Sequence, residues 1–366
     1  MTPADGRYLG LISGTSCDGI DAALIEVAGN TVRLVDAFAG RYEPGLRTTL
    51  LELPERPQLS LGEFGALDNA VAEAFAEAAR TLLERQPPDA PPVTAIGSHG
   101  QNVWHAPAQG LSLQLGNPSL IAARTGITTV ADFRRKDVAL GGQGAPLAPA
   151  FHRATLGAAD ESRWVLNLGG IANLTRLDRG PLLGFDTGPA NGLMDAWCQR
   201  HTGKPYDSDG DWAASGTVDE ALLDRLMADD YFRRPPPKST GREHFNPGWL
   251  DRALAEVRTP SEADVQRTLL ELTVRSVLGA MAAAGGEADR LLVCGGGAAN
   301  GALMRRLAEQ ARCPVQATDT LGVPADWLEA MAFAWFAANT LAGQPTAVAS
   351  VTGAERDAVL GGIFHA

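Results

Sequence analysis

Short apolar runs separated by polar or glycine-rich turns open the chain, which is the pattern of neighbouring β-strands. These runs predict strands at residues 8–12, 20–27 and 31–38. Gly29-Asn30 favours a hairpin between the last two, because both residues tolerate positive φ. The same order of strand, glycine turn, strand, tight turn and strand returns at residues 164–168, 171–177 and 182–185. The repeat predicts two similar α/β halves with a cleft between their two hairpins.

Helical patterns and further strands fill the sequence between these two units. A capping box, Ser60 with Glu63, begins a helix whose apolar positions fall on one face as far as Leu82. Other helices are predicted at residues 265–284, about 301–311 and 327–341, and strands at 93–97, 127–130 and 291–294. The mixture of both kinds of element predicts an α/β protein.

Composition narrows the classes of function. The formal net charge of −12 argues against a nucleic-acid-binding surface, which would need clustered Lys and Arg. The four cysteines form no CxxC pair, so neither a disulfide framework nor a zinc site is indicated. The N-terminus lacks the regions of a signal peptide, and no apolar run is long enough for a membrane span. These features predict a cytoplasmic protein without nucleic-acid or membrane partners.

A lone carboxylate follows the strand predicted at residues 182–185. Asp186 lies in Asp186-Thr187-Gly188-Pro189, where the small neighbours leave room for a ligand and a proton to accept. This position favours a catalytic base. The alternative is an ordinary turn, for which Asp, Gly and Pro are also typical.

Polar and glycine-rich segments follow other predicted strands. Ser98, His99 and Gln101 come after the strand at 93–97, and Arg134 lies in a charged cluster after the strand at 127–130. Ligand contacts and solvated turns are both open interpretations of these clusters. The glycine run at 295–297 joins a strand to a helix, where a base or phosphate could lie against the backbone, although an empty turn is equally open. The proline-rich stretch 235–243 is expected to line the site.

Six of these segments together resemble one known family. They are Gly14-Thr15-Ser16-Cys17-Asp18-Gly19-Ile20-Asp21, Ser98-His99-Gly100-Gln101, the block from Asp132-Phe133-Arg134 to Gly144-Ala145-Pro146, Asn167-Leu168-Gly169-Gly170-Ile171-Ala172-Asn173, Phe185-Asp186-Thr187-Gly188-Pro189 and Lys238-Ser239-Thr240-Gly241-Arg242-Glu243. They resemble the actin-like, sugar kinase and heat-shock ATPase superfamily, and more closely the anhydro-N-acetylmuramic acid kinase family.

The resemblance implies a fold and a reaction. The fold is two duplicated ribonuclease-H-like, actin-like ATPase domains at residues 1–145 and 146–366, with a nucleotide and substrate cleft between them. About the last 20 residues are expected to return to the first domain. The family converts 1,6-anhydro-N-acetylmuramic acid, ATP and water into N-acetylmuramic acid 6-phosphate and ADP, in cytoplasmic peptidoglycan recycling. A homodimer and closure of the domains over the ligands are also expected.

The resemblance also assigns roles to residues. Asp186 is expected to be the base that activates water. The expected ATP-binding residues are Gly14, Thr15, Ser16, Cys17, Asp18, Gly19, Ile20, Asp21, Asn167, Gly169, Gly170, Asn173, Gly295, Gly296, Gly297 and Asn300. The expected sugar-binding residues are Ser98, His99, Gln101, Arg134 and Glu329. Asp18 is the candidate for water-mediated Mg²⁺ binding, and the Cys17 thiol is expected to be exposed and dispensable.

Two alternatives remain at this point. A hexose or polyol kinase of the same superfamily would use the same Asp on a substrate hydroxyl. A non-enzymatic actin-like module would bind ATP and assemble or sense it, but would have little need for so many polar clusters after strands.

Overall fold

The computed structural model describes residues 3–14, 17, 19–53, 56, 58–241, 243–258, 260–285 and 287–366. The chain divides into two compact units. Unit 1 is Met1–Thr155 with Trp327–Ala366, and unit 2 is Leu156–Asp326. These limits differ from the expected domains, which met after residue 145 and returned a shorter C-terminal segment to the first domain.

Unit 1 is built on one mixed sheet. Its strands are β1 Gly6–Ser13, β2 Ile20–Ala28, β3 Thr31–Gly40, β4 Val93–Ala106, β5 Leu111–Leu115, β6 Thr129–Ala131 and β12 Gly362–Phe364. The order is β12-β6-β4-β1-β2-β3, with β5 paired to β4. Strands β1, β2 and β3 are antiparallel neighbours, whereas β4 runs parallel to both β1 and β6.

Unit 2 repeats this arrangement with a smaller sheet. Its strands are β7 Arg163–Leu168, β8 Ile171–Leu177, β9 Leu183–Pro189, β10 Arg290–Cys294 and β11 Val315–Ala317. The order β11-β10-β7-β8-β9 again joins an antiparallel meander to two parallel strands beside its first member. The predicted duplication of a ribonuclease-H-like α/β unit is therefore confirmed. The cleft expected between the halves stays a prediction.

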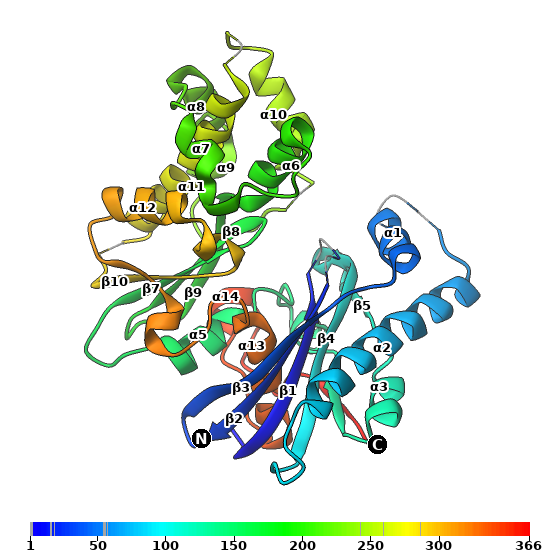
Figure 1. The fold of residues 1–366 in the computed structure, drawn as a ribbon. Coiled ribbons are helices and arrows are strands. Elements are labelled where there is room, and N and C mark those ends of the chain that lie inside the picture. Colours follow the sequence, from blue (N-terminus) through cyan, green and yellow to red (C-terminus); the bar gives the residue numbers. More distant parts are fainter. Residues whose placement is uncertain are drawn as a thin grey trace. The chain divides into compact units, whose positions relative to one another are not determined.

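Helices cover both faces of the unit 1 sheet (Figure 1). They are α1 Pro44–Glu52, α2 Leu61–Glu84, α3 Pro118–Thr125, α4 Arg135–Ala139, α5 Ala148–Leu156, α13 Leu328–Leu341 and α14 Ala349–Thr352, with a 3₁₀ turn at Pro107–Gln109. The predicted capping box of α2 is confirmed, because the Ser60 hydroxyl accepts from Glu63 N and the Glu63 carboxylate accepts from Ser60 N. Leu9 and Leu11 of β1 belong to the core cluster that contains the buried face of α2.

Helix α13 lies with its backbone directly against the opposite face of β1 and β4. A Cβ atom added at Gly10 would lie 1.8 Å from the Ala330 carbonyl oxygen, and one added at Gly97 would lie 2.0 Å from the Phe333 carbonyl oxygen. Because side chains alternate along a strand, Gly10 faces α13 while its neighbours Leu9 and Leu11 face α2. Glycine at these two positions therefore allows the helix to approach the sheet, which places Phe333 beside Gly97 and His99 in the first half of β4.

We expect Gly97→Ala to lower the free energy of unfolding by about 3 kcal/mol or more, because its methyl group would overlap a backbone carbonyl that cannot rotate away. Chemical denaturation of the two proteins measures the difference. Gly65→Ala in α2 is the matched control. A Cβ there meets no atom within 4 Å, so this substitution should raise helix stability by up to about 1 kcal/mol. Equal stabilities for the two variants would contradict the close packing of α13.

Unit 2 gathers its helices on one side of β7, β8 and β9 (Figure 1). They are α6 Asn191–Thr202, α7 Asp211–Ser215, α8 Glu220–Met227, α9 Asp230–Arg233, α10 Pro247–Leu254, α11 Glu262–Ala283 and α12 Gly301–Gln310, with 3₁₀ turns at Ser208–Gly210, Gly296–Ala299 and Thr318–Leu321. The core cluster joins Trp164, Leu174 and Phe185 of the sheet to buried leucines of these helices. None of the helices in the described parts of the chain is long and apolar enough to cross a membrane.

Two strands are longer than the sequence indicated, and both corrections concern the candidate site. Strand β4 does not end at Gly97 but runs on to Ala106, because its second half pairs with β5. Ser98, His99 and Gln101 are therefore buried strand residues and do not lie in a turn. Strand β9 likewise continues beyond Phe185 to Pro189.

Candidate functional site

Asp186 is part of a strand and not of a loop. It pairs with Asn173 of β8, and a bulge between Ala172 and Asn173 lets the pairing continue to Pro189. The turn that Asp-Thr-Gly-Pro favours by composition does not form, because hydrogen bonds to β8 keep this segment extended. The carboxylate therefore projects from a backbone that the sheet holds in place, which suits a group that must be positioned accurately.

A row of cross-strand neighbours joins Asp186 to the expected nucleotide-binding segments of unit 2. Asn173 pairs with Asp186 on one side and with Asn167 of β7 on the other, and Asn167 pairs with Cys294 of β10. Gly295 follows Cys294 directly, and a Cβ added there would lie 2.3 Å from the Asn167 Oδ1. The sheet thus aligns the carboxylate, two amides and the glycine turn in one row.

The Asp186 carboxylate is tied to a distant part of the chain. Its Oδ2 accepts a hydrogen bond of 3.0 Å from Thr240 N, and Asp186 N donates to the Lys238 carbonyl oxygen at 3.1 Å. Burial raises the pKa of Asp186 to about 6, although the Thr240 bond opposes the rise, and the nearby Glu243 charge adds to it. A carboxylate with this pKa is ionised at neutral pH and is a stronger base than an ordinary Asp.

Tyr231 also contacts the backbone of Asp186. Its hydroxyl donates to the Asp186 carbonyl oxygen at 2.8 Å, and its own carbonyl oxygen accepts from Lys238 Nζ at 3.1 Å. Burial, together with the charge of Asp186, raises the pKa of Tyr231, so the hydroxyl remains a donor. The Lys238 ammonium also lies 4.6 Å from the centre of the Tyr231 ring. The aromatic ring thus holds together the strand and the segment that contacts it.

The two glycine turns of unit 2 have different surroundings. The hairpin turn Gly169-Gly170 packs against the start of α6, where Ala190 N donates to the Gly170 carbonyl and Asn191 N to the Gly169 carbonyl. In the other turn, Gly295 has a φ of +78° and Asn300 caps α12 by accepting from Leu303 N. A Cβ added at Gly296 would meet no atom within 4 Å, so the backbone of this turn has open space above it.

In unit 1, Arg134 and His99 are in direct contact. Arg134 Nε donates to His99 Nε2 at 3.0 Å, and the other ring nitrogen of His99 lies 2.8 Å from the Gly100 carbonyl oxygen. Nε2 must be the acceptor, so His99 carries its proton on Nδ1. Burial, with the Arg134 charge, lowers the pKa of His99 well below its usual value. Burial also lowers the pKa of Arg134 to about 10, although Glu329 opposes this, so the guanidinium remains charged.

Helix α13 completes this cluster. The Phe333 ring lies 4.7 Å from the His99 ring and 5.6 Å from that of Phe133. Ser98 Oγ is buried with no hydrogen-bond partner among the described residues, so it is a donor that a ligand could satisfy. A pocket of about 240 Å³ is lined by Ser98, His99 and residues of β5, α3 and β12. The structure therefore brings His99, Arg134 and Glu329 together, whereas Ser98 shares with His99 only the lining of this pocket.

Gln101 is not available in the same way. Its Nε2 donates to the Gly14 carbonyl oxygen at 3.1 Å, and its Oε1 accepts from the Tyr42 hydroxyl at 3.1 Å. The Gln101 side chain thus binds the backbone of the first glycine loop at Gly14. Its expected contact with the sugar stays a prediction. Cys17 in the same loop is buried, which corrects the expectation of an exposed thiol.

Part of the first loop lies outside the described residues, namely Thr15, Ser16 and Asp18. The expected Mg²⁺ contact of Asp18 is therefore not tested. Across the described ranges, no group of three or more His, Cys, Asp or Glu side chains could hold a metal ion.

Two residues that contact Asp186 were given no such role from the sequence. Tyr231 and Thr240 lie 45 and 54 positions from Asp186 along the chain, and each supplies a hydrogen bond to it. The proline-rich stretch was expected to line the site, but nothing in its composition indicates which residue would face the carboxylate. Thr240 Oγ1 is buried without a hydrogen-bond partner among the described residues.

Comparison with known proteins gives one family for the whole chain. Residues 6–366 match the family described as anhydro-N-acetylmuramic acid kinase. A relative with that name from Xylella fastidiosa is 53% identical over 98% of this chain and 96% of its own length. One from Xanthomonas axonopodis pv. citri is 52% identical over 98% of each chain. Among solved structures, the (R)-2-hydroxyglutaryl-CoA dehydratase component A of Acidaminococcus fermentans is 11% identical, with a TM-score of 0.48 over 92% of this chain and 99% of that one.

Proposed function

The chain belongs to the anhydro-N-acetylmuramic acid kinase family and is a kinase, and we propose that it phosphorylates 1,6-anhydro-N-acetylmuramic acid with ATP. The products are N-acetylmuramic acid 6-phosphate and ADP. Membership of this family sets aside the non-enzymatic actin-like module. It also disfavours an ordinary hexose or polyol kinase, whose substrate already has the hydroxyl that receives the phosphoryl group.

The observation that carries the proposal is the environment of Asp186. The substrate has no free 6-hydroxyl, because O6 is bonded to C1, so water must open this ether before or during phosphoryl transfer. That step needs a base strong enough to deprotonate water as it attacks, yet ionised at neutral pH. A strand-held carboxylate with a pKa near 6 meets both requirements.

The bond changes follow from this assignment. The oxygen of a water molecule attacks C1 while one of its protons passes to an Asp186 carboxylate oxygen. The bond between C1 and O6 breaks, and its electron pair remains on O6. O6 then attacks the γ-phosphorus, and the bond between this phosphorus and the β–γ bridging oxygen breaks to release ADP. Asp186 later returns its proton to solvent.

ATP is proposed to bind along the row of residues that leads from Asp186 through Asn173 and Asn167 to the glycine turn at Gly295. Asn167 and Asn173, with the amides of Gly169 and Gly170, would contact phosphates. The adenosine would lie over the turn at Gly295–Asn300, where the backbone at Gly296 is open. Gly14, Cys17, Gly19, Ile20 and Asp21 of the first loop are the proposed contacts from unit 1. Mg²⁺ would offset the phosphate charge, and Asp18 remains the proposed residue for its hydration shell.

The sugar is proposed to bind through Ser98, His99, Arg134 and Glu329. Arg134 is the proposed partner of the lactyl carboxylate, because a guanidinium can donate two parallel hydrogen bonds to that group. Because Nε donates to His99, the two terminal nitrogens would be the donors to this carboxylate. The neutral His99 ring therefore orients the guanidinium and adds no second charge.

Isotope labelling tests the coupled reaction. In ¹⁸O-water, we expect the product to carry one ¹⁸O atom at C1 and none in the phosphate, since water attacks carbon and O6 comes from the substrate. Mass spectrometry after rapid quenching and reduction of C1 measures the label. Product incubated in ¹⁸O-water without enzyme controls for exchange at C1. Label in the phosphate, or faster phosphorylation of plain N-acetylmuramic acid, would refute the proposal.

A further inference from the structure

The segment that contacts Asp186 is attached to unit 2 at a second place. We call residues 238–241 and 243–245 the Asp186 loop. At its beginning, Lys238 O accepts from Asp186 N, and Thr240 N donates to the Asp186 carboxylate. At its end, His244 Nε2 lies 3.0 Å from Asp229 Oδ2. The loop is thus pinned to Asp186 on one side and to Asp229 on the other.

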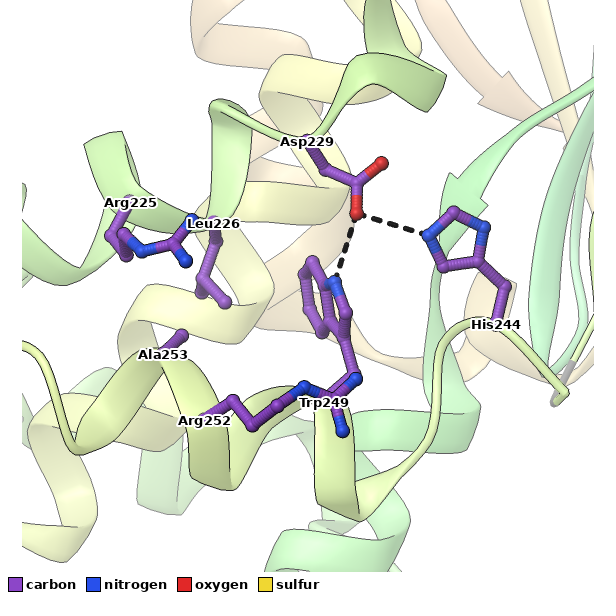
Figure 2. Close-up of a pocket in the computed structure, with 7 residues that line it drawn as sticks. All are labelled: Arg225, Leu226, Asp229, His244, Trp249, Arg252 and Ala253. Atoms are coloured by element: carbon purple, nitrogen blue, oxygen red, sulfur yellow. Dashed lines mark hydrogen bonds and ion pairs between the residues drawn. The ribbon is translucent and has the colours of Figure 1, made fainter.

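The Asp229 carboxylate accepts hydrogen bonds from three parts of unit 2. Its Oδ2 accepts from Trp249 Nε1 at 3.0 Å as well as from His244, and its Oδ1 accepts from Tyr231 N at 2.9 Å. Figure 2 shows the His244 and Trp249 rings converging on this one carboxylate. Tyr231 in turn donates its hydroxyl to the Asp186 carbonyl oxygen. Asp229 is therefore linked to Asp186 by two routes, one through the loop and one through α9.

This cluster is not a solvated surface pair. The side chains of Asp229 and His244 are only 19% and 31% exposed, so solvent screens their interaction weakly. The His244 ring stacks on buried Phe245 with centroids 4.3 Å apart, and the Tyr231 ring meets it edge-on at 5.9 Å. Burial raises the pKa of Asp229, but its hydrogen bonds outweigh this and the pKa lies below its usual value. Asp229 is thus an ionised acceptor that would be left unsatisfied without its donors.

We infer that the hydrogen bond between His244 and Asp229 positions the Asp186 loop for the reaction, so that His244 is a positioning residue. The inference rests on the proposed role of Asp186 as base. When the bond is present, the loop shields the carboxylate from bulk water and holds the Thr240 amide on it. When the bond is lost, the loop can move away and the geometry needed for proton transfer is no longer maintained.

Two substitutions separate the hydrogen bond from the packing of the ring. His244→Phe keeps an aromatic ring between Phe245 and Tyr231 but cannot donate to Asp229. His244→Gln loses the ring but retains an N–H donor. The site borders a pocket of about 310 Å³, lined by Asp229, His244, Trp249 and both Arg225 and Arg252, so the new side chains have room. We expect kcat to fall by on the order of 100-fold in His244→Phe and to recover substantially in His244→Gln.

The pH profile supplies a readout that a purely structural role would not move. Burial is the main cause of the raised pKa of Asp186, and Glu243 on the loop adds to it. Loosening the loop should therefore shift the acid limb of kcat in His244→Phe to lower pH, while the KM for ATP stays unchanged. Asp229→Asn, which weakens the acceptor of the same hydrogen bond, should shift the limb in the same direction, so the inference remains testable if His244→Phe fails to fold.

His201→Phe is the matched control. His201 in the same unit also contacts a carboxylate, Glu262 at 3.0 Å, and packs on Trp197, but forms no hydrogen bond, ion pair or ring contact with the described residues of the Asp186 loop. The His201→Phe substitution should leave kcat and the acid limb of its pH profile unchanged. If His244→Phe behaves like His201→Phe, or if His244→Gln is the more impaired of the two, the inference is wrong. Asp186→Asn, assayed in parallel, separates the positioning role of His244 from the base role of Asp186. An active Asp186→Asn enzyme would show that Asp186 is not the base.

Discussion

Asp186→Asn is expected to lower kcat by about three orders of magnitude, the size of a lost general base. Asn can still accept from Thr240 N through its amide oxygen, so the local geometry should survive, but it cannot take a proton from water. The wild-type kcat/KM should fall as the pH drops through about 6, because protonation removes the base, and this acid limb should be absent from the residual activity of the variant. Steady-state kinetics between pH 5 and 8 measure both effects.

Stability distinguishes lost chemistry from lost folding in this variant. Because the folded state raises the pKa of Asp186, it disfavours the ionised form. This cost to stability builds up as the pH rises from the unfolded pKa of 3.8 and is fully present above the folded pKa of about 6. Removing the charge should therefore leave the melting temperature at pH 7.5 equal to that of the wild type or higher. ATP should bind almost as before. Asp251→Asn, an exposed Asp paired with Arg200 in the same unit, is the control that should keep full activity. A near-normal rate for Asp186→Asn would exclude it as the base.

Arg134→Ala is expected to raise the KM for the anhydro sugar by about 100-fold, the value of a charge-assisted hydrogen-bonded pair. The KM for ATP should change little, because the proposed contacts of Arg134 are with the lactyl carboxylate. The variant should also lose discrimination between 1,6-anhydro-N-acetylmuramic acid and 1,6-anhydro-N-acetylglucosamine, which lacks the lactyl group. Competition between the two sugars, followed by product analysis, measures this.

The control for Arg134 is Arg124→Ala, which removes an exposed guanidinium of unit 1 that pairs with Glu73 on the surface. It should leave both KM values unchanged. If Arg134→Ala still prefers the lactyl sugar as strongly as the wild type, another residue must bind the carboxylate. A parallel loss of ATP affinity would indicate that the substitution disturbs more of unit 1 than the sugar contacts.

The helix and hairpin signals of the sequence proved reliable where local interactions decide the structure. Ser60 and Glu63 form the predicted capping box. The repeated meander, strands β1 to β3 and β7 to β9, is confirmed because apolar alternation and glycine turns are properties of neighbouring residues. Strand ends were less well predicted. Strand β4 is extended by its pairing with β5, which no local pattern reveals, and β9 continues along β8 past a bulge that the sequence does not indicate.

The sequence by itself determined the duplicated α/β fold, the family and Asp186 as the candidate base, because these depend on short motifs and on their order. Only the tertiary structure decided what surrounds that carboxylate. Thr240, Tyr231 and, behind them, Asp229 and His244 reach Asp186 through contacts between segments distant in the chain. Burial and hydrogen bonds from these segments set the pKa of Asp186, and both arise only after the chain has folded. The sequence therefore identified the candidate carboxylate, and the fold decided its pKa and its hydrogen bonds.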